Sequence, residues 1–444
     1  MKRVRNIGSI FLSVMLMVLI VLAGCSSKEG NASEGEANTT GSKQSADEKP
    51  LEIEFWYGQG GTLAETIERF IAEFNDSQDT ITVKGVAQGN YTETYQKLQA
   101  GIAAKEVPAV VLLENDATRS LISKKAIEPL DKYIEENTDF NPDDFVPSFY
   151  NQGTVDNGQY ALPLYGTTQV LYYRNDVFEE LGLTKEDLQT WESLEATAAK
   201  IKKEKGMTGW MPMWGSGNLI DAVYSKGGKI LSDDGKEVLI DSPEWIETWE
   251  FFRKAIHEEE TMAINHGGQG WEYWYKTIDE VMQGKAFGYT GSSGDQGDLD
   301  FSVVSAAPQP GWEDHKAAPG AGALLGAIPA AASDAEKAAA FEFLSFFTSA
   351  EKTADWSMST GYIAVRKSAK EVAAFKAYAE ENPQILIPLE QAESASAPFV
   401  DPTGGKILDA LSIATDKVEI EGVSAEKALK EAKETAQQAL DAVQ

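Results

Sequence analysis

Strand-like and helix-like segments alternate between residues 51 and 113, and this order constrains the fold more than any other feature of the chain. Residues 51–55 alternate apolar and polar side chains, which is typical of a half-buried strand. Residues 62–74 then place apolar side chains at helical spacing. A second strand, a second helix and a continuously apolar strand follow at 81–83, 91–104 and 109–113. The series predicts βαβ units with a parallel sheet, and so an α/β fold.

Segments of the same two kinds continue to the C-terminus. Strands are expected at 170–173, 286–289 and 323–328. Helices are expected at 191–205, from Ser242-Pro243, behind the capping box Ser333 to Glu336, and after Ser424. The body that begins near residue 50 is too large for one ordinary core, so we expect two lobes.

The first 25 residues have the pattern of an export signal. Lys2, Arg3 and Arg5 precede an apolar run that ends in Leu22-Ala23-Gly24-Cys25. The last four residues, Leu22 to Cys25, resemble the lipobox of bacterial lipoproteins. This resemblance implies a signal peptide over 1–24 and a lipid (diacylglycerol, with palmitate) on Cys25. The alternative is an uncleaved membrane anchor, since the apolar run is nearly long enough to span a bilayer.

Composition separates this leader from the body. Residues 26–49 contain no aromatic or branched aliphatic side chain, so we expect a disordered tether over 25–49. Cys25 is the only cysteine, and the body therefore has no disulfide. The formal net charge is −31, which argues against nucleic acid or an anionic membrane surface as a partner.

Motifs for catalysis or metal binding are weak. The three histidines, His257, His266 and His315, lack a second ligand at metal-binding spacing, and no G-x-S-x-G motif occurs. The stretch Asp295-Gln-Gly-Asp-Leu-Asp300 is interpreted as a solvated acidic loop because it fails the spacing of a calcium loop. We expect no metal, no cofactor and no enzyme, although a glycosidase pair of carboxylates stays open among 70 acidic residues.

Aromatic residues gather beside glycine clusters. Trp56, Trp214, Trp271 and Trp274 lie close to glycine-rich turns, and Tyr362 follows Gly361. For any single tryptophan the alternative is packing in the core. As a group, flat apolar rings next to turns suit a cleft that holds the C–H faces of sugars.

The order and spacing of nine segments resemble family 1 extracellular solute-binding lipoproteins of ABC importers, mostly carbohydrate importers. The segments are FWYGQGG at 55–61, YTETYQKLQAGIAAKEVPAVV at 91–111, SKKAIEPLD at 123–131, YALPL at 160–164, VLYYRNDVFEELGL at 170–183, TWESLEATAAKI at 190–201, GKAFGYTGSSG at 284–294, STGYIAVRKSA at 359–369 and GVSAEKALKEA at 422–432. The pattern is most similar to the glycerol-3-phosphate-binding members of that family.

The resemblance implies a two-lobe binding-protein fold of type II with the ligand in the interlobe cleft. We expect lobe 1 to hold 50–157 and about 289–345, and lobe 2 to hold 158–288 and about 346–444. The implied function is capture of a small solute, a sugar, and its delivery to the transmembrane subunits of an ABC permease. The implied form is a monomer held by its lipid on the outer face of a Gram-positive-like cell membrane.

The resemblance also implies a ligand site. The residues at matching positions are Tyr91, Asn115, Thr167, Trp214, Ser292, Gly322 and Tyr362. The aromatic residues beside glycine clusters add Trp56, Trp271 and Trp274 as weaker candidates.

One departure from that pattern bears on the ligand. The phosphate-binding arginine is expected after Pro398-Phe399, yet no arginine is there and Lys406 is the only nearby cation. The sequence therefore favours an uncharged mono- or oligosaccharide. Glycerol 3-phosphate or a glycerophosphodiester is one alternative, and a surface enzyme that acts on glycosides or an adhesive lipoprotein is another.

Overall fold

A computed structural model describes residues 49–392 and 394–444, which form one compact unit. The predicted signal peptide, Cys25 and all of the predicted tether except Lys49 lie outside the described residues. In the part of the chain that the structure describes, no helix combines the length and the apolar character needed to cross a membrane.

The first three main strands form the parallel sheet that the sequence predicts. β1 (Leu51–Tyr57) pairs in parallel with β2 (Ile81–Ala87) and with β3 (Val110–Leu113). The intervening helices are α1 (Gly61–Ser77) and α2 (Tyr91–Ala104). α1 buries Ile67, Phe70 and Phe74 on one face because these apolar residues recur at helical spacing.

A long strand, β6 (Ala161–Arg174), joins the two halves of the molecule. Its first part pairs antiparallel with β10 (Ala321–Ala327), which also pairs with β3. Its second part pairs antiparallel with β8 (Gly288–Ser292) and β9 (Val304–Ala307), and the short β7 (Met211–Pro212) pairs in parallel with β8. The sequence predicted only residues 170–173 of β6, because Gly166, Thr167 and Thr168 interrupt its apolar pattern.

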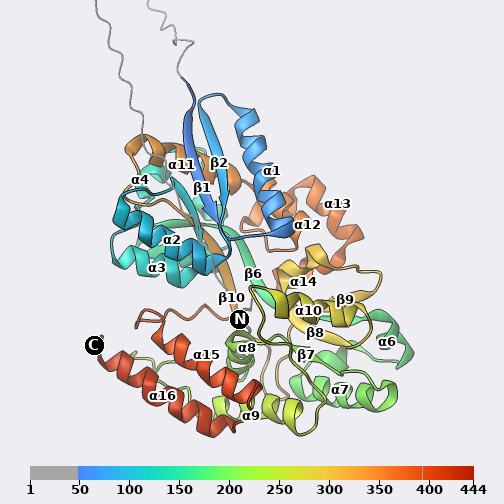
Figure 1. The fold of residues 1–444 in the computed structure, drawn as a ribbon. Coiled ribbons are helices and arrows are strands. Elements are labelled where there is room, and N and C mark those ends of the chain that lie inside the picture. The colour runs from blue at the N-terminus through green and yellow to red at the C-terminus, as the bar shows by residue number, and fades with distance from the viewer. Residues whose placement is uncertain (1–48, 393) are drawn as a thin grey trace, which may run out of the picture. The chain divides into compact units, whose positions relative to one another are not determined.

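Two large hydrophobic cores take residues from the two ends of β6. The elements around these two ends form two groups in Figure 1. The first core takes its residues from 53–165, 321–365 and Ala392, and the second from 171–312 and 407–440. A smaller cluster around Tyr172 and Tyr289 adjoins the second core. The lobe boundaries given above remain a prediction.

Helices surround both cores. The remaining helices that pack on the first core are α3 (Asn115–Ser123), α4 (Asp131–Glu136), α5 (Pro147–Tyr150), α11 (Asp334–Phe347) and α12 (Ala350–Thr360). Those that pack on the second core are α6 (Asn175–Glu180), α7 (Trp191–Lys205), α8 (Ser216–Ser225), α9 (Pro243–His257), α15 (Lys406–Glu419) and α16 (Ala425–Asp441). α14 (Leu386–Ala392) also contributes Ala392 to the first core. α10 (Glu272–Met282) and α13 (Ala373–Glu381) contribute buried residues to two smaller clusters.

Short elements complete the fold. They are the hairpin of β4 (Thr154–Val155) and β5 (Gly158–Gln159), and the 3-10 turns η1 (Pro142–Asp144), η2 (Asn151–Gly153), η3 (Lys185–Leu188), η4 (Ser293–Asp298), η5 (Lys367–Glu371) and η6 (Pro383–Ile385).

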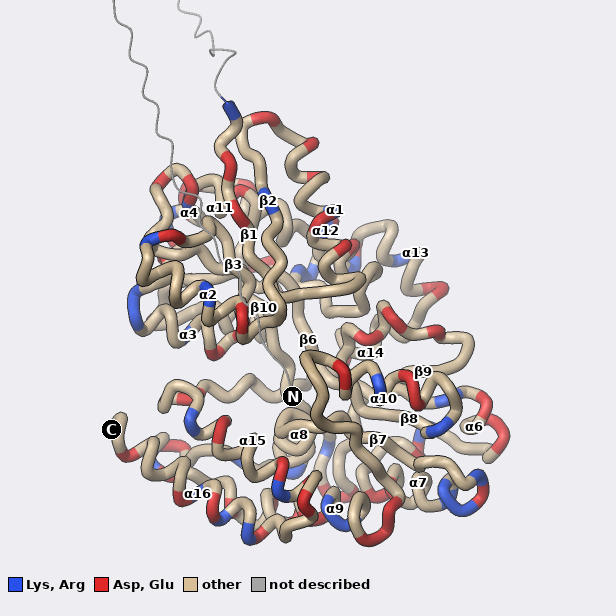
Figure 2. The backbone as a smooth tube through the Cα atoms, viewed as in Figure 1, with Lys and Arg blue, Asp and Glu red and all other residues tan. Residues whose placement is uncertain are grey.

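Two of three helix ends confirm the local predictions in full. Ser333 and Glu336 form the capping box of α11, and Gly206 ends α7 in the left-handed conformation at φ 67°. α16 begins directly after Ser424, although that side chain makes no capping hydrogen bond. Charged side chains concentrate on the outer helices and loops, whereas β10 carries none (Figure 2).

Candidate functional site

A cavity of about 770 Å³ lies where the two cores meet. One wall comes from the segments that follow the carboxyl ends of β1, β2 and β3: residues 58–63, Tyr91 and Glu114. In open α/β sheets, the carboxyl ends of parallel strands form the edge at which ligands bind. The position of this wall therefore follows from the βαβ topology.

The opposite wall and the floor come from the second half of the molecule and from the shared strands. The opposite wall contains Gly217 and Asp221 of α8, residues around the start of α10, and residues from Ser292 to Asp298. Residues 167–169 of β6 and residues 320–324 at β10 form the floor. The cavity is thus bounded by elements of both cores.

Tyrosines and one glutamine form a bonded group on the first wall. The Gln59 amide donates from Nε2 to the Tyr165 hydroxyl at 2.6 Å, and the Tyr91 and Tyr165 hydroxyls lie 3.4 Å apart. The Tyr165 and Tyr362 rings are 4.7 Å apart between centroids. Burial raises the pKa of Tyr91 to about 12, so this phenol stays neutral and can donate or accept a hydrogen bond.

A glycine in η4, two residues after the end of β8, makes room for the Tyr362 ring. A Cβ atom on Gly294 would collide with the ring carbons of Tyr362. The Ser292 hydroxyl accepts a hydrogen bond from the Gly294 N–H at 3.1 Å and lies 3.4 Å from the Thr167 hydroxyl. The segment GSSG therefore brings Ser292 and Thr167 together beside Tyr362.

Asp295 is a largely buried carboxyl group in the opposite wall of the cavity. Its Oδ1 accepts a hydrogen bond from Trp274 Nε1 at 2.8 Å, and its Oδ2 accepts one from the Tyr289 hydroxyl at 3.1 Å. Burial raises the pKa of Asp295 to about 7 despite these donors. The prediction of a solvated acidic loop is therefore wrong for Asp295, which is 6 % exposed, and correct for Asp298, which is exposed.

Asp221, on α8, is a second buried carboxyl group at the cavity. Its carboxylate accepts hydrogen bonds from the Gly320 N–H at 2.9 Å and from Gln309 Nε2 at 3.2 Å. Burial raises the pKa of Asp221 to about 7. The side chain thus fixes the segment before β10 against α8 at the edge of the cavity.

Seven of the ten predicted ligand-site residues line this cavity. They are Tyr91, Thr167, Ser292, Gly322, Tyr362, Trp271 and Trp274. The structure places these seven residues at the cavity. Their contact with a ligand stays a prediction.

The other three lie elsewhere. Trp214 donates from Nε1 to Asp416 at 3.0 Å and packs edge-on against Tyr273. Asn115 hydrogen-bonds with Arg119, while its neighbour Glu114 lines the cavity. Trp56 donates to Glu54 at 2.8 Å and packs against the first core.

Sequence reasoning missed several polar residues that line the cavity. They are Gln59, Glu114, Gln169, Asp221, Asp295 and Asp298. Gln59 lies two residues after the end of β1, and Glu114 directly follows β3, so the rule that ligands bind at strand ends could have found them. Nothing in the local sequence marks Asp221 or Gln169, since their positions depend on how α8 and β6 pack.

The charged side chains in the described lining of the cavity are all acidic. Among the residues that the structure describes, the cavity is lined by four carboxylic side chains and by no lysine, arginine or histidine. Lys406 begins α15 with an exposed side chain and does not line it. Within residues 49–392 and 394–444, no cluster of three His, Cys, Asp or Glu side chains could hold a metal ion.

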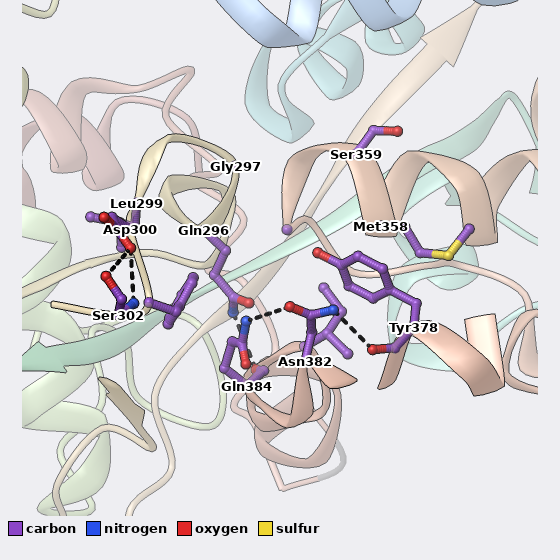
Figure 3. Close-up of a pocket in the computed structure, with 13 residues that line it drawn as sticks. Gln296, Gly297, Leu299, Asp300, Ser302, Met358, Ser359, Tyr378, Asn382 and Gln384 are labelled. Carbon is purple, nitrogen blue, oxygen red and sulfur yellow. Dashed lines mark hydrogen bonds between the residues drawn. The ribbon is translucent and has the colours of Figure 1, made fainter. Parts of the chain in front are cut away.

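A second cavity of about 450 Å³ is lined by residues of η4, α12, α13 and η6 (Figure 3). Its amide side chains bond to one another and to nearby carbonyls: Gln296 Nε2 donates to the Gln384 carbonyl at 3.3 Å, and Asn382 Nδ2 donates to the Tyr378 carbonyl at 3.1 Å. These two amide groups thus already have partners. We assign it no ligand.

A family model described as bacterial extracellular solute-binding protein matches residues 69–384, more than half of the chain. The chain belongs to this family. Among curated proteins, the sn-glycerol-3-phosphate-binding periplasmic protein UgpB of Yersinia pestis bv. Antiqua (strain Antiqua) is 25% identical over 356 residues, which cover 75% of this chain and 78% of that protein.

Solved structures show the same fold. UgpB from Mycobacterium tuberculosis in complex with glycerophosphocholine has a TM-score of 0.79 at 24% identity, with 89% of this chain and 99% of that chain covered. An ABC substrate-binding protein from Listeria monocytogenes in complex with cycloalternan has a TM-score of 0.77 at 20% identity, with 88% and 100% covered. These likenesses confirm the predicted α/β fold of the two-lobe binding-protein type. The relatives are binding proteins, and the family is extracellular.

Proposed function

We propose that this protein captures a small polyhydroxylated solute of carbohydrate type outside the cell membrane and delivers it to an ABC permease. The observation that carries the proposal is the cavity between the two cores, which combines aromatic rings with hydrogen-bonding groups from both sides. Indole faces such as those of Trp271 and Trp274 match the apolar faces of sugar rings. Polar side chains around them are suited to hydroxyl groups.

Phosphate is the less favoured ligand group. The relatives include proteins whose names or structures specify glycerol 3-phosphate, glycerophosphocholine and cycloalternan, so the family alone does not decide. A phosphate group is held best by charged donors, and the described lining of this cavity offers carboxylates in their place. Glycerol 3-phosphate or a glycerophosphodiester therefore remains the second candidate, supported by the relatives but opposed by the charge of the lining.

The remaining features of the proposal concern attachment and motion. Lipid on Cys25 would keep the monomer next to its permease, and the tether would let the two-lobe body reach it. The two lobes, with the boundaries predicted above, would close over the solute about the strands that join them. No reaction is part of this function, in keeping with the binding role of the relatives.

Calorimetry and thermal unfolding of the purified protein test the function. We expect a sugar or polyol without phosphate to bind in the micromolar range or tighter and to raise the melting temperature, because a ligand at one hundred times its Kd adds about 2.7 kcal/mol of stability. Micromolar binding of glycerol 3-phosphate or glycerophosphocholine, with no binding of any sugar, would overturn the choice of ligand. Turnover of a glycoside by the protein would overturn the binding role itself.

A further inference from the structure

Three aromatic side chains meet at nearly right angles across the cavity. The Tyr91 ring, on α2, and the Trp271 ring, just before α10, have centroids 6.4 Å apart and planes inclined at 78°. The Trp271 and Trp274 rings are 6.0 Å apart and inclined at 85°. Trp271 is 43% exposed, so a large part of its apolar surface is left without a packing partner. Rings in this arrangement present faces and edges to one shared space.

Carboxylates stand on both sides of the same cavity without a positive counterpart. Glu114, from the wall of the first core, is exposed at the cavity, whose described lining contains no lysine, arginine or histidine. Its enclosure by the surrounding walls and, to a lesser extent, the negative charge of Asp116 raise its pKa. Asp298, from the opposite wall, is also exposed and accepts a hydrogen bond from Thr62 at 3.4 Å. Like charges on facing walls repel each other when the walls approach.

Buried amides in the cavity also lack partners. Gln59 is 5% exposed, and while one end of its amide bonds to Tyr165, its Oε1 has no hydrogen-bond partner. The buried Oε1 of Gln169, on β6, has none either. A buried polar atom without a partner costs stability until a ligand supplies one. These two amides therefore point, independently of the carboxylates, to a solute that donates hydrogen bonds.

We propose that the solute carries a positively charged ammonium group in addition to hydroxyl groups, and that Tyr91, Trp271 and Trp274 enclose this group beside Glu114 and Asp298. The inference rests on the proposed function and revises the uncharged sugar that the sequence favours. A cation is attracted to the faces of indole and phenol rings, and it also offsets the repulsion between the carboxylates. The amides of Gln59 and Gln169 then bind the hydroxyl groups of the same solute.

Calorimetry with matched pairs of probes tests the ammonium group. The pairs are glucosamine against glucose, and choline against its neutral tert-butyl isostere, at a pH slightly below neutral where the amine is charged. We expect at least one ammonium probe to bind about tenfold tighter than its neutral partner. The two pairs distinguish an amino sugar from a quaternary ammonium compound.

Equal or tighter binding of both neutral partners, or no binding of either ammonium probe, would overturn the inference. Micromolar binding of neutral sugars would at the same time leave the capture of solutes intact. Failure of all sugars, polyols and ammonium probes to bind would count against both proposals.

Two substitutions locate the subsite. Asp298→Asn removes one charge from an exposed side chain. It should weaken the binding of the preferred ammonium probe about tenfold and leave the binding of the neutral partner unchanged. Asp279→Asn, an exposed carboxylate of α10 outside the cavity, is the matched control and should change neither. Equal effects of the two substitutions would show a general effect of net charge and contradict a local subsite. Trp271→Ala should also reduce the preference for the ammonium probe.

Discussion

Trp249 and Trp271 show how differently two parts of this molecule use the same side chain. Trp249 lies within α9, is fully buried and packs beside Trp245 at 5.8 Å. Trp271 follows the glycine-rich segment before α10 and is 43% exposed at the cavity. The first ring holds the second core together, whereas the second contributes little to the fold. Burial, and not residue type, therefore separates structural tryptophans from those available to a solute.

Removing a core ring should have the largest effect. We expect Trp249→Ala to reduce the free energy of unfolding by about 3–5 kcal/mol, because it leaves a cavity in the second core. Urea unfolding followed by circular dichroism measures the change, and Trp249→Phe should lose clearly less. A loss below about 1 kcal/mol for Trp249→Ala would mean that the ring is not a core element.

Glu419→Gln should give the next largest effect, and only at high pH. Glu419 is 1% exposed, and burial raises its pKa from 4.5 to about 8. The folded protein therefore keeps a proton that the unfolded chain loses above about pH 4.5, so stability falls as the pH rises from 4.5 to 8.

The neutral glutamine avoids this loss. At pH 8 the variant should be more stable than the parent by on the order of 2 kcal/mol, and near pH 4 the two should agree. Urea unfolding at both pH values checks the prediction. If the stability difference between variant and parent were the same at both pH values, Glu419 would not titrate in this range.

Trp274→Phe tests a side chain that lines the cavity and also supports the fold through a hydrogen bond. The substitution removes the N–H that donates to Asp295, so a buried carboxyl group loses one of its two side-chain donors. We expect a loss of about 1 kcal/mol in unfolding free energy, larger at pH 8 than at pH 5 because the charged carboxylate needs the donor more. Tyr273→Phe on the same helix is the control. Equal losses in both variants would argue against the hydrogen bond as the cause.

Trp271→Ala should have the smallest effect on stability and thereby complete the comparison. We expect a change within about 0.5 kcal/mol, as for other exposed side chains, together with a clear loss of affinity for the bound solute. Chemical unfolding and calorimetry on the same preparation provide both values. Strong destabilisation with intact affinity would place Trp271 among the structural residues.

Local patterns predicted the elements well where one face of a segment is buried. The helices α1, α7 and α11 follow their apolar spacing and caps, and β1 to β3 follow their alternation or their apolar runs. β6 was predicted only in part, because the strand passes from one core to the other and its middle residues face the cavity. Residues at such a junction are not packed into either core, so the sequence there lacks the apolar pattern of a buried strand.

The cavity was predictable only as far as local context reaches. Glycine beside an aromatic residue drew attention to Trp271 and Trp274, which line the cavity. The same pattern occurs at Trp210, which follows Gly209 but is fully buried, with its N–H bonded to Thr290. Trp214 precedes Gly215, yet its N–H bonds to Asp416 on α15. Such outcomes depend on segments far away in the chain, which no local pattern can reveal.

The place of β10 in the sheet has a consequence for how the chain is made. β10 lies between β3 and β6, although it is synthesised long after both. Until it arrives, β3 and β6 have no strand between them, and the first core cannot close. Such pairing between distant segments delays folding, because chain entropy is lost before contacts compensate for it. A growing chain that cannot finish its first core is well suited to passage through a membrane in an unfolded state, before its last third has emerged from the ribosome.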